Sequence, residues 1–171
     1  MIEMEETPRP AARAHELLRA SHAAHFTLSQ MADTKASILM AATFVTFTIT
    51  VGQSRDGAGP PLPLLVLGGF AFIAAILTVL AIMPATAPPK MGRLNLLFFG
   101  AYAPLSEQEY LTQMRVLLQS DERIIDAMTI DIYQNGQVLG RKKYKLLSYA
   151  YRVFVIGMSA SLLTFVIERY F

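Results

Sequence analysis

The chain of 171 residues contains no cysteine and no tryptophan, and only 16% of its residues carry a charge. The lack of cysteine excludes disulfides, zinc sites with thiolate ligands and thiol nucleophiles. Phosphate-binding glycine loops, Ser-His-Asp sets and paired catalytic carboxylates are missing from the sequence as well. We therefore expect that the protein is not an enzyme, has no catalytic residues and needs no cofactor.

An excess of one charge is also missing, because 15 basic and 13 acidic residues leave a net charge of only +2. This surplus is too small to indicate nucleic-acid binding, so we expect no nucleic-acid partner. Three histidines, His15, His22 and His25, fall on one predicted helix. A metal site needs more ligands than these histidines and the nearby Glu16 and Asp33 offer, and we expect no bound metal.

The sequence is rich in long apolar runs. Hydrophobic residues make up 53% of the chain, and its mean hydropathy is +0.39. Residues 62–83 carry no charge, and a helix of this length, about 33 Å, can cross a bilayer core of about 30 Å. A buried helix of a soluble bundle is the alternative, but a small soluble domain rarely needs so long an uncharged helix. The sequence predicts a membrane protein.

Two further runs predict membrane spans. Residues 36–54 are uncharged but diluted by four threonines, whose hydroxyls can bond back to carbonyls of the preceding turn. We favour a transmembrane helix over an interfacial one for this run. Residues 153–167 are short for a span and reach a full crossing together with residues 146–151. The predicted fold class is an all-α membrane protein with three transmembrane helices: an N-terminal hairpin over residues 36–83, turned by the loop 52–61, and a C-terminal span over residues 149–171.

Soluble helices are predicted on either side of the hairpin. Residues 1–35 have the pattern of an amphipathic helix that starts at Thr7-Pro8. Residues 84–148 form a second helical region, separated from the hairpin by Pro84, Pro88 and Pro89. Its apolar segment, residues 94–103, is too short to span a bilayer and is expected at the membrane surface or in the soluble core.

Helix signals follow one another within that second region. Ser106 and Glu109 have the spacing of a capping box, which predicts a helix from there through Leu118. Ser120 is predicted to cap a second helix, which begins at Asp121. The pair Asn135-Gly136 is compatible with a turn, but we favour a continuous helix with a weak point, because strand-like alternation is missing on both sides. Continued into the last span, this helix would be a rod of roughly 70 Å.

The distribution of basic residues predicts the orientation in the membrane. Only Arg55 and Arg169 fall on the side of the short loop and the C-terminus. The basic residues that flank the spans on the other side are Lys35, Lys90, Arg93, Arg141, Lys142, Lys143 and Lys145. We expect the N-terminus and residues 84–148 in the cytosol. The acidic residues 1–10 do not resemble a cleaved signal peptide, so targeting is expected to come from the internal apolar segments.

Asp33 and Lys35 lie where the N-terminal helix meets the first span. Side chains two positions apart do not face each other on a helix, so each is expected to have another partner. In one interpretation Lys35 anchors to anionic lipid headgroups and Asp33 is solvated. In the other, both belong to a polar site at the cytosolic surface of the membrane.

A second charged cluster, Arg141-Lys142-Lys143-Tyr144-Lys145, precedes the last span. From the pattern alone, binding of these four cations to acidic lipids is favoured. The alternative is an anionic ligand held by one or two cations, with Tyr144 offering a ring. Gln134 and Asn135 could add amide contacts to a base or a sugar edge. The ligand-binding candidates are Asp33, Lys35, Asn135, Lys143 and Tyr144.

Three motifs occur in a characteristic order: Asp33-Thr34-Lys35-Ala36-Ser37-Ile38-Leu39, Leu97-Phe98-Phe99-Gly100 and Lys143-Tyr144-Lys145-Leu146-Leu147. In this order and spacing the chain resembles the transmembrane effectors of the Pycsar anti-phage systems. Their pattern is a D-x-K-A opening to the first span, a hairpin of two spans, an F-F-G segment before a soluble helical pair, and a K-Y-x-x-L entry to the last span. Tyr110, Asn135 and Ala150 also fall where that pattern has Tyr, Asn and Ala. The resemblance covers nearly the whole chain from about Leu17.

The resemblance implies a multi-pass protein of the bacterial inner membrane that works together with a pyrimidine nucleotide cyclase. It implies that phage infection triggers synthesis of cyclic UMP or cyclic CMP, and that the effector then damages the membrane before phage mature. Such a ligand carries one negative charge and a flat base. A cytosolic pocket with a cation and aromatic rings would suit both parts.

A ligand-biased homo-oligomer is the mechanism that fits both the resemblance and the predicted helices. Residues 94–147 would bind the nucleotide better in one packing than in another. The small residues near Gly68 and Gly157 would let the spans repack. Two other classes stay open on the residues alone: a holin-like pore that needs no ligand, and a non-toxic membrane scaffold or accessory subunit.

Overall fold

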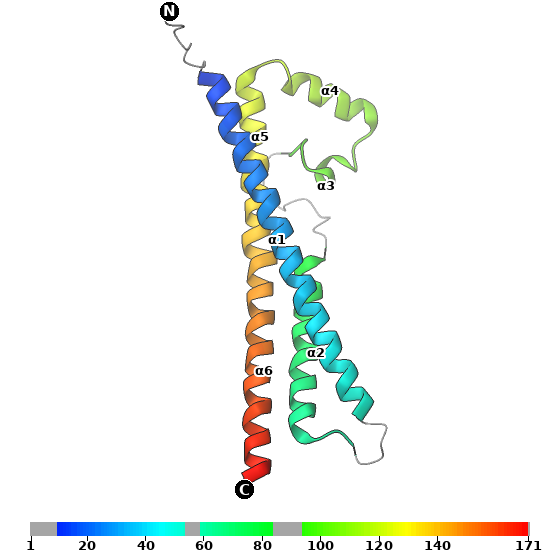
Figure 1. Ribbon diagram of the computed structural model, residues 1–171. Helices are drawn as coiled ribbons and strands as arrows, with labels where there is room; N and C mark the ends of the chain where they lie inside the picture. The colour runs from blue at the N-terminus through cyan, green and yellow to red at the C-terminus, as the bar shows by residue number, and fades with distance from the viewer. Residues whose placement is uncertain (1–9, 54–58, 84–93, 171) are drawn as a thin grey trace, which may run out of the picture. The chain divides into compact units, whose positions relative to one another are not determined.

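The computed structural model describes residues 10–53, 59–83 and 94–170 (Figure 1). Over these residues the chain forms helices and no strand, which confirms the predicted all-α class. The helices are α1 (Pro10–Gln53), α2 (Leu62–Ile82), α3 (Phe99–Tyr102), α4 (Glu107–Leu117), α5 (Asp121–Val138), the π-helix η2 (Leu139–Tyr144) and α6 (Lys145–Tyr170). The predicted helix start at Thr7-Pro8, the three prolines after the hairpin, and Arg55, Lys90 and Arg93 lie outside the described residues.

The chain divides into two compact units, each built from two separate stretches of sequence. We call Met1–Leu28 with Pro84–Leu139 the helical unit, and Ser29–Met83 with Gly140–Phe171 the span unit. The helical unit contains α3, α4, α5 and the first part of α1. The span unit contains α2, α6 and the rest of α1.

Three helical stretches are long and apolar enough to cross a membrane. They lie within Ala12–Gln53, Leu62–Ile82 and Asp121–Tyr170. The three predicted spans are thereby confirmed at the level of length and composition. The third stretch is 50 residues long because α5, η2 and α6 follow one another along the chain without a gap.

The packing of α2 is the reverse of that of a helix in a soluble protein. Its buried residues are small or ring-constrained: Pro63, Gly68, Ala71, Ala74, Thr78 and Ala81. Many of its large apolar side chains are exposed, among them Leu65, Phe72, Ile73, Ile76 and Val79. Small residues at helix interfaces with large residues outside are typical of helices packed in lipid, where burial of large apolar groups brings no gain. This arrangement supports a membrane-embedded span unit.

Small residues also set how closely the three spans approach. A Cβ atom added at Gly157 of α6 would overlap the Cβ of Phe70 on α2. One added at Gly68 of α2 would lie 2.7 Å from the Thr50 hydroxyl oxygen on α1. Nearer the other end of α2, one cluster joins all three helices: Ala32, Ala36 and Leu39 of α1, Ala81 of α2, and Leu147 and Ala150 of α6.

The threonines that dilute the first span are compatible with lipid. Thr46, Thr48 and Thr50 donate hydrogen bonds to the carbonyls four residues earlier, and Thr43 to the carbonyl three residues earlier, at 2.9 Å in each case. Such back-bonding satisfies a hydroxyl within its own helix. The predicted use of these hydroxyls is confirmed.

The caps of the helical unit were predicted correctly from sequence. Ser106 and Glu109 form the complete capping box of α4, and the Ser120 hydroxyl accepts from the backbone N–H of Arg123 at the start of α5. The Ser106 hydroxyl and, to a smaller extent, the Ser106 backbone N–H donate hydrogen bonds to the Glu109 carboxylate, and these bonds lower the pKa of Glu109 below its ordinary value.

Helix α5 continues through Asn135-Gly136, as favoured. Its irregular stretch comes later, at η2.

Candidate functional site

A buried polar cluster organises the helical unit around Asp131 of α5. Asn95 Nδ2 donates to Asp131 Oδ1 at 2.9 Å and to Gln134 Oε1 at 3.0 Å. Asn135 Nδ2 donates to the other carboxylate oxygen, Asp131 Oδ2, at 3.0 Å. Asn95 and Asp131 are 4% and 3% exposed. A buried carboxylate is costly unless it accepts hydrogen bonds, and these two amides supply them.

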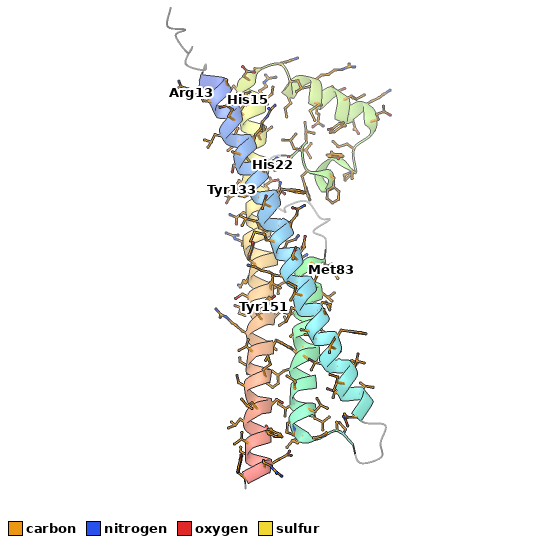
Figure 2. The ribbon with its side chains drawn as sticks, in the orientation of Figure 1. Arg13, His15, His22, Met83, Tyr133 and Tyr151 are labelled. Carbon is orange, nitrogen blue, oxygen red and sulfur yellow. The ribbon has the colours of Figure 1, made fainter. Side chains whose placement is uncertain are left out.

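The cluster fixes the segment that leads into α3. Asn95 Oδ1 accepts from the backbone N–H of Leu97 at 2.9 Å, which closes a short turn. The neighbouring Leu96 is buried. From α1, His22 approaches Asp131 with Nε2 3.7 Å from Oδ2, and Figure 2 labels this histidine. Residues 94–97 are therefore fastened to α5 by side chains rather than by regular secondary structure.

Replacing Asn95 with alanine is expected to destabilise the helical unit by about 1–3 kcal/mol, because Asp131 Oδ1 and the Leu97 N–H would lose their partner. Hydrogen exchange at the Leu97 amide, measured on the full chain in detergent, should become faster. Gln108→Ala, on the exposed face of α4, is the control and should leave that exchange rate unchanged. Unchanged protection of Leu97 in the Asn95 variant would show that the cluster does not hold this segment.

A cavity of about 380 Å³ opens beside this cluster, between residues 94–96, α4 and α5. Its walls are mainly apolar: Leu94, Leu96, Val116, Leu117, Ala127 and Ile130. A smaller set of polar side chains joins them: Asn95, Thr112, Gln113, Arg123 and Asp126. A mostly apolar cavity of 300–1,000 Å³ with a few converging polar groups is the usual form of a small-molecule site.

Arg123 is the cation of this cavity and is held in place by the turn between α4 and α5. Its Nη1 donates to the Val116 carbonyl at 2.9 Å and to Gln119 Oε1 at 3.2 Å. These bonds use the two hydrogens of Nη1, and a guanidinium carries three more on Nη2 and Nε. A guanidinium anchored in this way is suited to paired hydrogen bonds with a phosphate or carboxylate.

The span unit contains a second polar site, at the π-helix. Lys143 Nζ lies 2.9 Å from each carboxylate oxygen of Asp33 and 2.9 Å from the Ser29 hydroxyl oxygen. Lys142 Nζ donates to the carbonyl of Met83, the C-cap of α2, at 2.8 Å. Tyr151 Oη donates to the Lys35 carbonyl at 2.9 Å. Met83 and Tyr151 are labelled in Figure 2.

The five ligand-binding candidates do not form one group. Asp33 and Lys143 pair directly, which supplies the separate partner that Asp33 was expected to have. Tyr144 packs against the shared core of the three spans. Lys35 is exposed, and its backbone carbonyl accepts a hydrogen bond from Tyr151 Oη. Asn135 belongs to the other unit, where it holds Asp131. A role in ligand binding stays a prediction for all five.

The cavity residues Asn95, Arg123 and Asp126 were not among the sequence-based candidates. One signal was available for Asn95, because it stands alone as an amide within the apolar run 94–99. Such a residue, when buried, must find hydrogen-bond partners. Arg123 and Asp126 had no comparable signal, since charged residues on a helix that follows an N-cap are usually solvated.

The chain matches a family model described as the Pycsar effector protein domain over residues 16–168. This match takes in most of both units, contains Leu62–Ile82 and covers nearly all of the other two candidate stretches. No curated protein and no solved structure matches the chain. The chain is a membrane protein with an anti-phage effector role at the level of its family, and it belongs to the Pycsar effector family.

Proposed function

We propose that the protein senses a cyclic pyrimidine nucleotide, cyclic UMP or cyclic CMP, made by a partner cyclase, and then disrupts the bacterial inner membrane. The family match over residues 16–168 is the observation that carries this proposal. It joins the helices of the helical unit and three apolar spans in one domain, which is the composition that a membrane effector with its own sensor requires. The protein would act by binding and rearrangement, without a catalytic step.

The cavity of the helical unit is the proposed nucleotide site. Its volume of about 380 Å³ falls within the range of small-molecule sites. The leucine, valine and isoleucine side chains that line it offer apolar surface to the flat face of a pyrimidine. Asn95 lines the cavity and is held by Asp131, and Asn135 holds Asp131 in turn. Asn135 would therefore contribute as a positioning residue.

Arg123 and Asp126 give this site a charge pattern that suits the two ends of a cyclic nucleotide. The phosphodiester carries one negative charge, and Arg123 is the cation among the cavity residues. Hydrogen bonds from a guanidinium to a phosphate are strengthened by charge. The carboxylate of Asp126 accepts hydrogen bonds only, which suits the ribose 2′-hydroxyl or the N–H groups of a pyrimidine edge.

The proposed orientation places the N-terminus and the helical unit in the cytosol, where the nucleotide is made. Lys35, Lys142, Lys143 and Lys145 flank the spans at the end of the span unit where α2 terminates. Basic residues beside spans favour the cytoplasmic side. Lys35, which is exposed, would anchor to anionic lipid headgroups there.

Membrane disruption would follow from a change in how copies of the protein pack. The small buried residues of α2 allow close helix contacts in which few large side chains interdigitate. The same face of α2 can therefore pack in an alternative way. A nucleotide that binds one packing more tightly shifts the population of a homo-oligomer toward it. The membrane would then be breached by the repacked spans.

Bacteria that carry the chain with or without a pyrimidine nucleotide cyclase test the proposal. Uptake of a membrane-impermeant dye and growth arrest are expected only with an active cyclase, and an inactivated cyclase is the control. Dye uptake without a cyclase would indicate a ligand-independent, holin-like pore. An intact membrane in all strains, together with stable copurification of another protein, would indicate a scaffold or accessory subunit.

A further inference from the structure

Two consecutive lysines of the π-helix η2 form hydrogen bonds with two different helices of the span unit. Lys143 reaches Asp33 and Ser29 on α1, and Lys142 reaches the Met83 carbonyl at the end of α2. Both lysines precede α6, which continues directly from η2. The start of α6 is thus tied to both of its neighbours by side chains of one short segment.

The ammonium group of Lys143 is saturated in this arrangement. It carries three hydrogens, and three oxygen atoms lie 2.9 Å away: both carboxylate oxygens of Asp33 and the Ser29 hydroxyl. The Lys143 side chain is 21% exposed and that of Asp33 is 49% exposed. The pair is therefore accessible enough to open, and it satisfies the lysine completely while it is closed.

The π-helical segment receives support from contacts with α1 and α2. A π-helix has hydrogen bonds from residue i to residue i+5 and is rare in proteins. Single π-helical turns occur frequently at functional sites. The support on α1 and α2 comes from Asp33, Ser29 and the Met83 carbonyl. Without this support, the segment would be expected to relax to α-helix.

Relaxation of η2 would turn α6 about its own axis. A π-turn holds one residue more than an α-turn, and one residue of α-helix corresponds to a rotation of about 100°. Leu147, Ala150 and Gly157 form the buried face of α6. A rotation of this size would move that face off its present contacts, including the close approach of Gly157 to Phe70.

From these contacts we propose that the Asp33–Lys143 pair is an autoinhibitory latch, which holds the spans in their closely packed, non-disrupting arrangement. Opening the pair releases η2 and lets α6 rotate into the packing that breaches the membrane. The inference rests on the proposed function, because it supposes that the chain disrupts membranes. It adds to that function the contact that restrains it in the closed state.

Leakage of dye from lipid vesicles, measured without nucleotide, tests the latch. Asp33→Asn and Lys143→Gln each open the pair and are expected to raise the basal leakage rate by about 5-fold or more, the lower end of typical coupling between sites. The doubly exchanged variant Asp33→Lys with Lys143→Asp restores an ion pair and is expected to return leakage toward the wild-type rate. Arg115→Gln removes a charge from an exposed position of α4, outside the span unit, and is expected to leave leakage unchanged.

Basal leakage at the wild-type rate in both single variants would overturn the latch. Equal leakage in the single and the exchanged variants would also overturn it, since a general loss of packing would then explain the effect. Helix content by circular dichroism and elution as one species identify any variant that fails to fold. If one single variant fails to fold, the leakage rate of the other single variant tests the latch. If the wild-type chain does not respond to cyclic UMP or cyclic CMP while Asp33→Asn still leaks, the sensing proposal fails and the latch stands.

Discussion

Gly157→Ala is expected to destabilise the packing of α6 on α2 by about 1–3 kcal/mol, the usual cost of adding a methyl group to a closely packed interface. The added carbon would overlap the Cβ of Phe70. A Cβ atom is fixed by its backbone, so Phe70 cannot turn away and the two helices must move apart. Denaturant titration of the purified chain in detergent measures the loss of stability.

Gly69→Ala is the matched control for this substitution. It lies next to Gly68 on α2, and a Cβ added there meets nothing within 4 Å. Both changes gain the same helix propensity, up to about 1 kcal/mol, so the difference between them isolates the contact between helices. If the Gly157 and Gly69 variants were equally stable, the close approach of α6 to α2 would not exist in the folded protein.

Arg123→Gln is expected to weaken binding of the activating nucleotide by roughly 10- to 150-fold, because hydrogen bonds to a charged group contribute about 1.5–3 kcal/mol. The substitution removes the cation that lines the cavity and keeps hydrogen-bonding capacity in the side chain. Equilibrium dialysis with labelled cyclic UMP or cyclic CMP on the full chain in detergent measures the affinity.

Arg115→Gln provides the comparison for nucleotide binding. Arg115 is exposed in the last turn of α4 and is not among the cavity residues, so this variant loses the same charge without changing the proposed site. It is expected to bind like the wild-type chain. Equal weakening in the two variants would point to a general effect of charge, and unchanged binding by Arg123→Gln would exclude the cavity as the phosphate site.

The spans and the helix caps could be predicted from sequence because their signals are local. The length of an uncharged run such as residues 62–83 is enough to predict a membrane-spanning helix. Ser106 with Glu109 is readable as a capping box, because the two residues that bond are three positions apart. Continuity of the helix through Asn135-Gly136 followed from the surrounding pattern, since alternation typical of strands is missing there.

The pairing of Asp33 with Lys143 and the cavity could not be predicted, because both depend on residues that are distant in sequence. Asp33 and Lys143 are separated by 110 positions, and four cations near residue 143 were equivalent candidates for the partner of Asp33. The cavity is lined jointly by residues 94–96, α4 and α5, which are separate stretches of the sequence. The π-helix carries no composition signal, so the expected weak point was assigned to Asn135-Gly136 rather than to the following turn.

Release of dye from vesicles by the purified wild-type chain tests nucleotide-triggered membrane disruption most directly. The vesicles are made of phosphatidylethanolamine and phosphatidylglycerol, and cyclic UMP, cyclic CMP, cyclic AMP or no nucleotide is added. Rapid release with a cyclic pyrimidine nucleotide, and slow release in the other samples, is the predicted result. Equal release in all samples would contradict a nucleotide-gated effector.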